Sequence, residues 1–114
     1  MEILKKNNRI YFNDNNKAFA NISIDHTNNR VKLELIKVIP DYRNRKIATN
    51  LMSNILQYIS RNLYDINTII LNPLPLDGNG LSHEKLITFY RKFGFTMLLH
   101  GNRNSPYLML KNLF

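Results

Sequence analysis

The chain has 114 residues, carries a formal net charge of +8 and contains no cysteine. This length suits one domain over residues 1–114, and the lack of cysteine excludes disulfides, thiolate metal sites and thiol catalysis. No apolar run approaches the ~18 residues that cross a bilayer, and the N-terminus lacks the apolar core of a secretory signal. We therefore expect a cytoplasmic protein without membrane contact. The charge suits an anionic partner, such as nucleic acid, an acidic protein or a phosphorylated cofactor, or else a merely basic soluble domain.

Short strands joined by turns rich in Asn and Asp open the chain. Residues 9–13 and 18–24 are predicted strands, separated by the turn DNNK. A second turn, DHTNN, leads into a third strand at residues 30–39. This part of the chain leaves no room for helices.

The third strand changes phase along its length. Val31, Leu33 and Leu35 are predicted on one face of it and Lys32 and Glu34 on the other, but Ile36 and Val38 form its apolar set further on. Such a one-residue shift indicates a β-bulge, which re-aims backbone groups and often lies beside a functional site. A strand end that is buried on both faces is the alternative.

A βαβ unit follows the third strand. Apolar spacing predicts a helix over residues 43–62, and residues 68–75 read as a strand ending at a proline. The strand at 68–72 should therefore run parallel to the third strand.

A second helix and two strands complete the predicted chain. The helix covers residues 83–93, with Ser82 as its N-cap and Gly94 at its C′ position. The last strands lie within residues 95–100 and 107–111. The expected fold class is α/β (α+β), with a mixed twisted sheet of about six strands and two main helices.

Three cations, Arg43, Arg45 and Lys46, lie at the predicted start of the first helix. A helix N-terminus already carries about half a positive charge, so exposed cations there should cost roughly 0.3–1 kcal/mol each. A bound di- or polyphosphate would reverse this penalty, because free backbone N–H groups and cations both attract it. We predict a pyrophosphate-bearing cofactor along the end of the strand at 30–39. The alternative is that the cations simply point into water.

The segment KVIPDYRNRKIATNLMSNILQYI resembles the acyl-CoA-binding motif of the GNAT acetyltransferase superfamily. That motif has Arg or Gln, two variable residues, Gly, one variable residue, and Gly or Ala. Arg43 and Ala48 match it, whereas Lys46 stands in place of the glycine. We expect Lys46 to lie inside the helical turn, where no positive φ is needed. The lysine would then either weaken CoA binding or supply a further cation.

A second segment, LITFYRKFGF, is similar to the later FY-x-x-x-GF signature of the same family, and it follows the first at the expected distance. The resemblance implies transfer of an acetyl group from acetyl-CoA to a primary amine, without a metal. The pyrophosphate would lie on the backbone N–H groups of residues 43–48, which are Arg43, Asn44, Arg45, Lys46, Ile47 and Ala48.

The resemblance also implies where the rest of the cofactor lies. The backbone of residues 36–39, including Val38 and Ile39, would pair with the pantetheine arm where this strand and the strand at 68–72 splay apart. An amide near Val38 would stabilise the oxyanion. Asn72 would hydrogen-bond the pantetheine, or serve only as the turn residue before Pro73.

Two side chains are the candidate catalytic residues. By resemblance, Tyr90 would protonate the departing CoA thiolate, with a place in the core as the alternative. Glu34 would accept the proton of the amine, or lie solvated or salt-bridged on its strand. His26 and His83 are further candidates for the base, each with a surface loop position as the alternative, and water alone could relay the proton.

The predicted chain lacks the helices that wall off the acceptor site in typical GNAT proteins. An open face suits a large acceptor, such as a lysine on a protein. Small phage-borne acetyltransferases that modify host proteins are similar in layout. If this chain is one of them, its location would be the cytoplasm of the host. Exposed strand edges would also allow a homodimer. A catalytically silent binding module and a small nucleic-acid-binding protein are the alternatives, and nucleic acid is the less favoured because the cations are not clustered.

Overall fold

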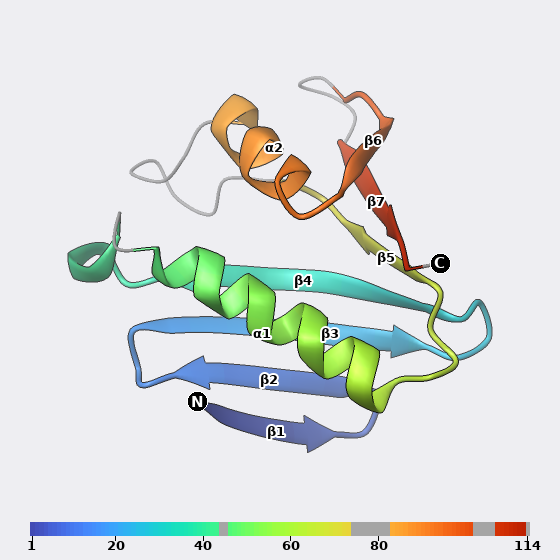
Figure 1. Ribbon diagram of the computed structural model, residues 1–114, viewed down its shortest axis with the longest axis horizontal. Helices are drawn as coiled ribbons and strands as arrows, with labels where there is room; N and C mark the ends of the chain where they lie inside the picture. Colours follow the sequence, from blue (N-terminus) through green and yellow to red (C-terminus); the bar gives the residue numbers. More distant parts are fainter. Residues whose placement is uncertain (44–45, 74–82, 102–106, 114) are drawn as a thin grey trace.

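A seven-stranded mixed sheet with helices packed on one face forms the fold (Figure 1). The structure is a computed structural model that describes residues 1–43, 46–73, 83–101 and 107–113. The strand order across the sheet is β1-β2-β3-β4-β5-β7-β6. The elements are β1 (Glu2–Lys6), β2 (Arg9–Asp14), β3 (Ala18–Asp25), β4 (Arg30–Val38), the 3-10 helix η1 (Pro40–Tyr42), α1 (Ile47–Asn62), β5 (Thr68–Leu71), α2 (His83–Arg91), β6 (Thr96–Leu99) and β7 (Leu108–Asn112).

The first four strands form an antiparallel meander whose turns are built on asparagines. Asn7, Asn15, Asn16 and Asn29 have positive φ, a conformation that asparagine tolerates better than most residues. The predicted turns DNNK and DHTNN are therefore confirmed. β4 and β5 pair in parallel, as predicted, and β7 lies antiparallel between β5 and β6.

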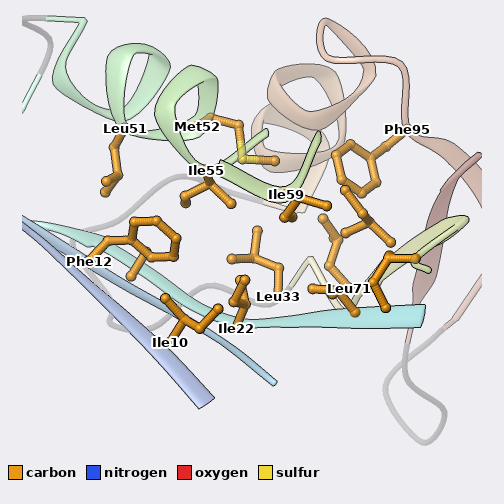
Figure 2. Packing of buried hydrophobic residues seen from close by; sticks show 14 of the residues in the cluster. Ile10, Phe12, Ile22, Leu33, Leu51, Met52, Ile55, Ile59, Leu71 and Phe95 are labelled. Atoms are coloured by element: carbon orange, nitrogen blue, oxygen red, sulfur yellow. The ribbon is translucent and has the colours of Figure 1, made fainter. Parts of the chain in front are cut away.

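The helices cover the same face of the sheet. The connections β4–α1–β5 and β5–α2–β6 step in the same direction across the sheet, and right-handed crossovers then place both helices on one side. In Figure 2, Leu51 and Ile55 of α1 face Phe12 and Leu33 of the sheet. Burial of this apolar stripe holds the helix to the strands, at about 25 cal/mol per Å² of apolar surface removed from water.

The predicted fold class is confirmed, with one strand more than expected. β1 was not predicted, because all five of its residues are exposed and it has no alternation of buried and exposed positions. β1 connects directly to β2, and the described residues between β1 and β4 form only strands and turns. The helices that typically follow the first strand in the GNAT family are thus absent from this part of the chain.

The predicted start of the first helix was wrong. α1 begins at Ile47 and not at residue 43. Pro40–Tyr42 form a 3-10 turn, Arg43 is extended, and Lys46 at the N-cap is left-handed, with φ 60° and ψ 17°. A left-handed residue cannot continue a right-handed helix. Arg43 and Lys46 therefore precede the helix, while Asn44 and Arg45 lie outside the described residues.

The second helix ends much as predicted. Gly94 follows α2 with a φ of 91°, which glycine adopts without strain and which suits the predicted C′ position. Ser82, the predicted N-cap, lies outside the described residues. Neither described α-helix combines the length and apolar character that a membrane span requires.

Candidate active site

A β-bulge in β4 marks the centre of the candidate site. Asn21 of β3 lies opposite Leu35 and Ile22 opposite Leu33, so Glu34 is the extra residue of β4. Before the bulge, the strand packs into the core through alternate apolar residues. After it, Ile36 and Val38 take over the core-facing positions, as their pairing with Ala20 and Ala18 shows. The predicted bulge is confirmed, but it lies one step earlier than predicted. Because Glu34 is the extra residue, Leu35 lies on the face opposite Val31 and Leu33 and not beside them.

β4 and β5 separate beyond the bulge. They pair only from Arg30 opposite Thr68 to Leu33 opposite Leu71, and β4 then continues to Val38 paired with β3 but not with β5. In Figure 1 the two strands diverge towards the end where η1 and the start of α1 lie. This arrangement matches the predicted splay and leaves part of the β4 edge unpaired by β5.

Backbone alternation determines which groups of β4 point into the splay. The Ile39 N–H donates to the Lys17 carbonyl at 2.8 Å, on the β3 side. Neighbouring residues of a strand direct their backbone groups to opposite sides, so the N–H and C=O of Val38 point away from β3. The Ile39 carbonyl accepts the Tyr42 N–H at 2.9 Å. Of the two residues predicted to bind pantetheine, only Val38 directs its backbone groups toward the splay.

Arg43 connects the end of β4 to the chain segment that leads into α1. Its Nε donates to the Val38 carbonyl at 3.2 Å in a partly buried position, and its own N–H donates to the Pro40 carbonyl at 3.3 Å. The Arg43 amide is thus engaged within the turn. What Arg43 brings to the splay is a guanidinium held beside Val38.

The left-handed conformation of Lys46 corrects the expectation that this position needs no positive φ. In the motif that the sequence resembles, this is the glycine position, and the backbone here has the conformation that glycine adopts most readily. A left-handed residue followed by a right-handed one turns successive N–H groups toward one point and forms an anion-binding nest. Lys46 and Ile47 form such a pair.

The first turn of α1 adds further donors. The Asn50 N–H makes the first intrahelical bond, to the Lys46 carbonyl at 3.0 Å, and no side chain of the described residues caps the start of the helix. The N–H groups of Ile47, Ala48 and Thr49 therefore have no acceptor within the helix. Thr49 was not among the predicted site residues, because the predicted helix start lay four residues too early.

Glu34 lies on the sheet face opposite the helices. Its carboxylate is 3.7 Å from the Arg9 guanidinium, and its side chain is 28% exposed. The predicted salt-bridged alternative is thus present, while the carboxylate stays accessible. Glu34 precedes Val38 by four residues, or about 13 Å of extended strand. A proton released near Val38 would therefore need ordered water to reach the Glu34 carboxylate.

Tyr90 lies in the core and is 5% exposed. Its ring packs edge-on against Phe89 and Phe95, with centroids 5.3 and 5.9 Å away. Burial raises the pKa of the Tyr90 hydroxyl to about 12, because the charged phenolate would lose its hydration. The hydroxyl therefore remains protonated at neutral pH and can act as a hydrogen-bond donor.

Other predicted site residues have structural contacts. The Asn72 side chain donates to the Tyr107 carbonyl at 2.7 Å and so ties the end of β5 to the start of β7. His26 is exposed and lies 2.9 Å from the Asp65 carboxylate, far along the chain. His83 begins α2. Among the residues that the structure describes, no three His, Asp or Glu side chains gather closely enough to hold a metal ion.

Comparison with known proteins assigns the family. Residues 6–97 match the sequence profile of the acetyltransferase (GNAT) domain. The chain belongs to the GNAT acetyltransferase family. The resemblance seen in the two sequence segments is thus confirmed. No curated protein sequence matches the chain.

Solved structures share the GNAT fold. An aminoglycoside 6′-N-acetyltransferase complexed with coenzyme A has a TM-score of 0.72 at 18% identity, covering 96% of this chain and 75% of that one. The anti-CRISPR protein AcrVA5 has a TM-score of 0.68 at 19% identity, covering 90% of this chain and 96% of that one. The PaiA N-acetyltransferase from Thermoplasma acidophilum, also with coenzyme A, has a TM-score of 0.61 at 20% identity over 83% of this chain, which spans about half (52%) of its length. At such identities the likeness establishes the fold and not the acceptor.

Proposed function

We propose that the protein transfers an acetyl group from acetyl-CoA to a primary amine on a large acceptor, most simply a lysine of a protein. The observation that carries this proposal is the splay of β4 from β5 beside the left-handed Lys46. Together they offer strand-edge groups for an extended arm and converging N–H groups for a pyrophosphate. Coenzyme A is a ligand with both parts.

The pyrophosphate would lie on the N–H groups of Lys46, Ile47, Ala48 and Thr49, with positive side chains around it. Lys46 is exposed, and Arg43 is held over the end of β4 by its bond to Val38. Asn44 and Arg45 belong to the same proposed site by their place in the motif. The helix dipole and the cations together offset the charge of the two phosphates.

The pantetheine arm would take the place of a strand beside β4. Its amides would pair with the outward-pointing backbone groups of Ile36. The Val38 N–H would then donate to the thioester oxygen as it becomes an oxyanion, an interaction that is stronger in the transition state than in the ground state. Asn72, held against Tyr107, would contribute through its side-chain oxygen.

Glu34 would accept the proton of the amine through water. The ammonium of a lysine must lose a proton before it can attack, since its pKa is about 10.4. Glu34 is the carboxylate at the bulge, and Arg9 at 3.7 Å orients it. Its separation from Val38 makes a water relay more suitable than direct contact.

Tyr90 would stabilise the departing thiolate by hydrogen bonding. With a pKa of about 12, its hydroxyl is a weaker acid than a thiol of pKa ~8.5. Complete proton transfer to the thiolate would cost about 5 kcal/mol at ~1.4 kcal/mol per pKa unit. A donated hydrogen bond has no such cost. The attacking nitrogen loses a second proton as the amide forms, and that proton can neutralise the sulfur.

The large acceptor is supported by the open side of the sheet. The described strands β1 to β4 follow one another through short turns, and no described helix lies against their outer side. A small metabolite would need walls that the described residues do not supply.

Calorimetric titration with acetyl-CoA tests the cofactor site. Wild type should bind in the micromolar range, and Arg43→Ala with Arg45→Ala should weaken binding at least tenfold. The matched control is Arg61→Ala with Arg91→Ala, which removes two cations from the last turns of the helices and should change the affinity less than twofold. Absence of binding by wild type would refute the enzyme assignment. Binding without acetylation of any primary amine would indicate a silent binding module instead.

A further inference from the structure

The outer face of the sheet carries a row across four strands that is apolar except for one asparagine. Leu4, Tyr11, Asn21 and Leu35 lie side by side in the register of β1, β2, β3 and β4. Leu4 is 63% exposed and Tyr11 37% exposed, whereas the neighbours Ile10 and Phe12 are buried on the other side. We call this row and the rows beside it the outer face. It lies behind the sheet as Figure 1 is drawn.

Positive side chains flank the apolar row. Lys6, Arg9 and Lys32 lie on one side of it and Lys37 on the other, and all four are exposed. The carboxylates on these rows are Glu2 and Glu34, the latter already paired with Arg9. The outer face is therefore apolar at its middle and positive at its margins, which is the layout of a protein-binding surface with a charged rim.

Asn21, at the centre of the row, has an incomplete set of hydrogen bonds. Its Oδ1 is buried and finds no donor among the residues that the structure describes. A buried acceptor without a partner costs roughly 1–3 kcal/mol, and such a group calls for a physical reason. A donor from a bound partner, reached by rotation of the Asn21 side chain, would complete it.

The outer face adjoins the proposed catalytic residues. Leu35 directly follows Glu34 at the bulge, and Val38 follows three residues later on the same strand. A partner lying across Tyr11 and Leu35 would thus bring its surface amines to the side of the splay that bears Glu34. Because it adjoins Glu34 and Val38, the outer face differs from an ordinary exposed sheet surface.

We propose that the outer face docks the acceptor protein through a surface that has an apolar centre and an acidic rim around the lysine to be acetylated. This inference rests on the proposed function and names the acceptor more closely. Nucleic acid fits less well, because a phosphate backbone would meet Glu2, Glu34 and an apolar row where no cation lies. The lysines at the margin instead suit isolated carboxylates, and such rim charges act mainly on the association rate.

The test compares acetyl transfer to three probes by measuring CoA release. One probe is a peptide with a single lysine, a leucine and four aspartates, and the second has asparagines in place of the aspartates. The third is Nα-acetyl-lysine methylamide, which is too small to reach the outer face. The test variant is Lys32→Gln with Lys37→Gln, and the matched control is Arg61→Gln with Arg91→Gln, which removes the same charge from the helices.

Wild type should use the aspartate peptide at least fivefold better than the asparagine peptide, as judged by kcat/KM at low salt. Lys32→Gln with Lys37→Gln should remove most of that preference, while the control keeps it, and both should acetylate the small amine within twofold of wild type. High salt should also remove the preference, because exposed charges are screened.

Equal use of both peptides by wild type, or an equal loss in the control variant, would overturn the docking inference alone. Acetylation of none of the three probes would overturn the proposed function and the inference with it. Inhibition by a single-stranded oligonucleotide that depends on Lys32 and Lys37 would assign the outer face to nucleic acid and so also overturn the inference.

Discussion

Replacement of Lys46 by glycine should stabilise the protein. A residue with a Cβ in the left-handed region costs roughly 1–2 kcal/mol, and Lys46 is there with a φ of 60°. Glycine removes that cost but gives the unfolded chain more freedom, which offsets roughly 0.5–1 kcal/mol. The net expectation for Lys46→Gly is about 1 kcal/mol of added stability. For 114 residues at ~2.1 cal/mol/K each, this corresponds to a Tm rise of about 4 °C.

Lys46→Ala is the matched control, since it removes the same charge but keeps the Cβ. Urea unfolding of wild type and both variants separates the effects of backbone and charge. Lys46→Gly should unfold at a higher midpoint with an unchanged slope, and Lys46→Ala should not. Equal midpoints for the two variants would show that residue 46 is not left-handed in solution. The account of the phosphate-binding nest would then be wrong.

Three other changes test separate parts of the structure. Tyr90→Phe should lower kcat at least tenfold but leave acetyl-CoA affinity, measured by calorimetry, within twofold, and an unchanged kcat would leave Tyr90 a core residue only. Asn21→Leu should raise the free energy of unfolding by about 1 kcal/mol, because the unpartnered Oδ1 is removed. It should also slow transfer to the aspartate peptide. A loss of stability would show that Asn21 Oδ1 has a hydrogen-bond partner in solution. The hydrogen bond from His26 lowers the pKa of the Asp65 carboxyl below its ordinary value of 3.8. The stability that Asp65 contributes is therefore present above about pH 4 and is lost as the pH falls through the pKa of the folded state. His26→Ala should therefore reduce the loss of stability in that acid range, and identical acid-unfolding curves would contradict this.

The bulge could be predicted from the sequence because it moves side chains between faces. Val31 and Leu33 are buried on the core side, and the shift of the apolar set to Ile36 and Val38 records the extra residue directly. Two motif segments then suggested the family, which the domain match shows. β1 has no such pattern of buried and exposed positions, because every one of its residues is exposed. It is held in the sheet by its pairing with β2.

The start of α1 could not be predicted, because no residue type at this point of the sequence indicates a left-handed conformation. In the described turns, the other non-glycine residues with positive φ are Asn7, Asn15, Asn16 and Asn29, and asparagine is a residue that indicates such turns. Lysine has no preference for that region, so Lys46 read as a helical residue. Its conformation follows from the path of the chain, which must turn from the end of β4 into a helix lying back across the sheet.

Strain that local sequence does not favour persists only where the surrounding structure imposes it, and it concentrates at functional sites. At the other left-handed non-glycine positions that the structure describes, the residue is asparagine, which tolerates this conformation. Lysine tolerates it less well, and a glycine at position 46 would adopt it without strain. What a glycine could not supply is a positively charged side chain at the N-cap of α1. If the cation is what offsets the strain, Lys46→Gly should be the more stable protein and the weaker binder of acetyl-CoA, with Lys46→Ala equally weak in binding. A glycine variant that gained both stability and affinity would show that the lysine is merely tolerated at this position.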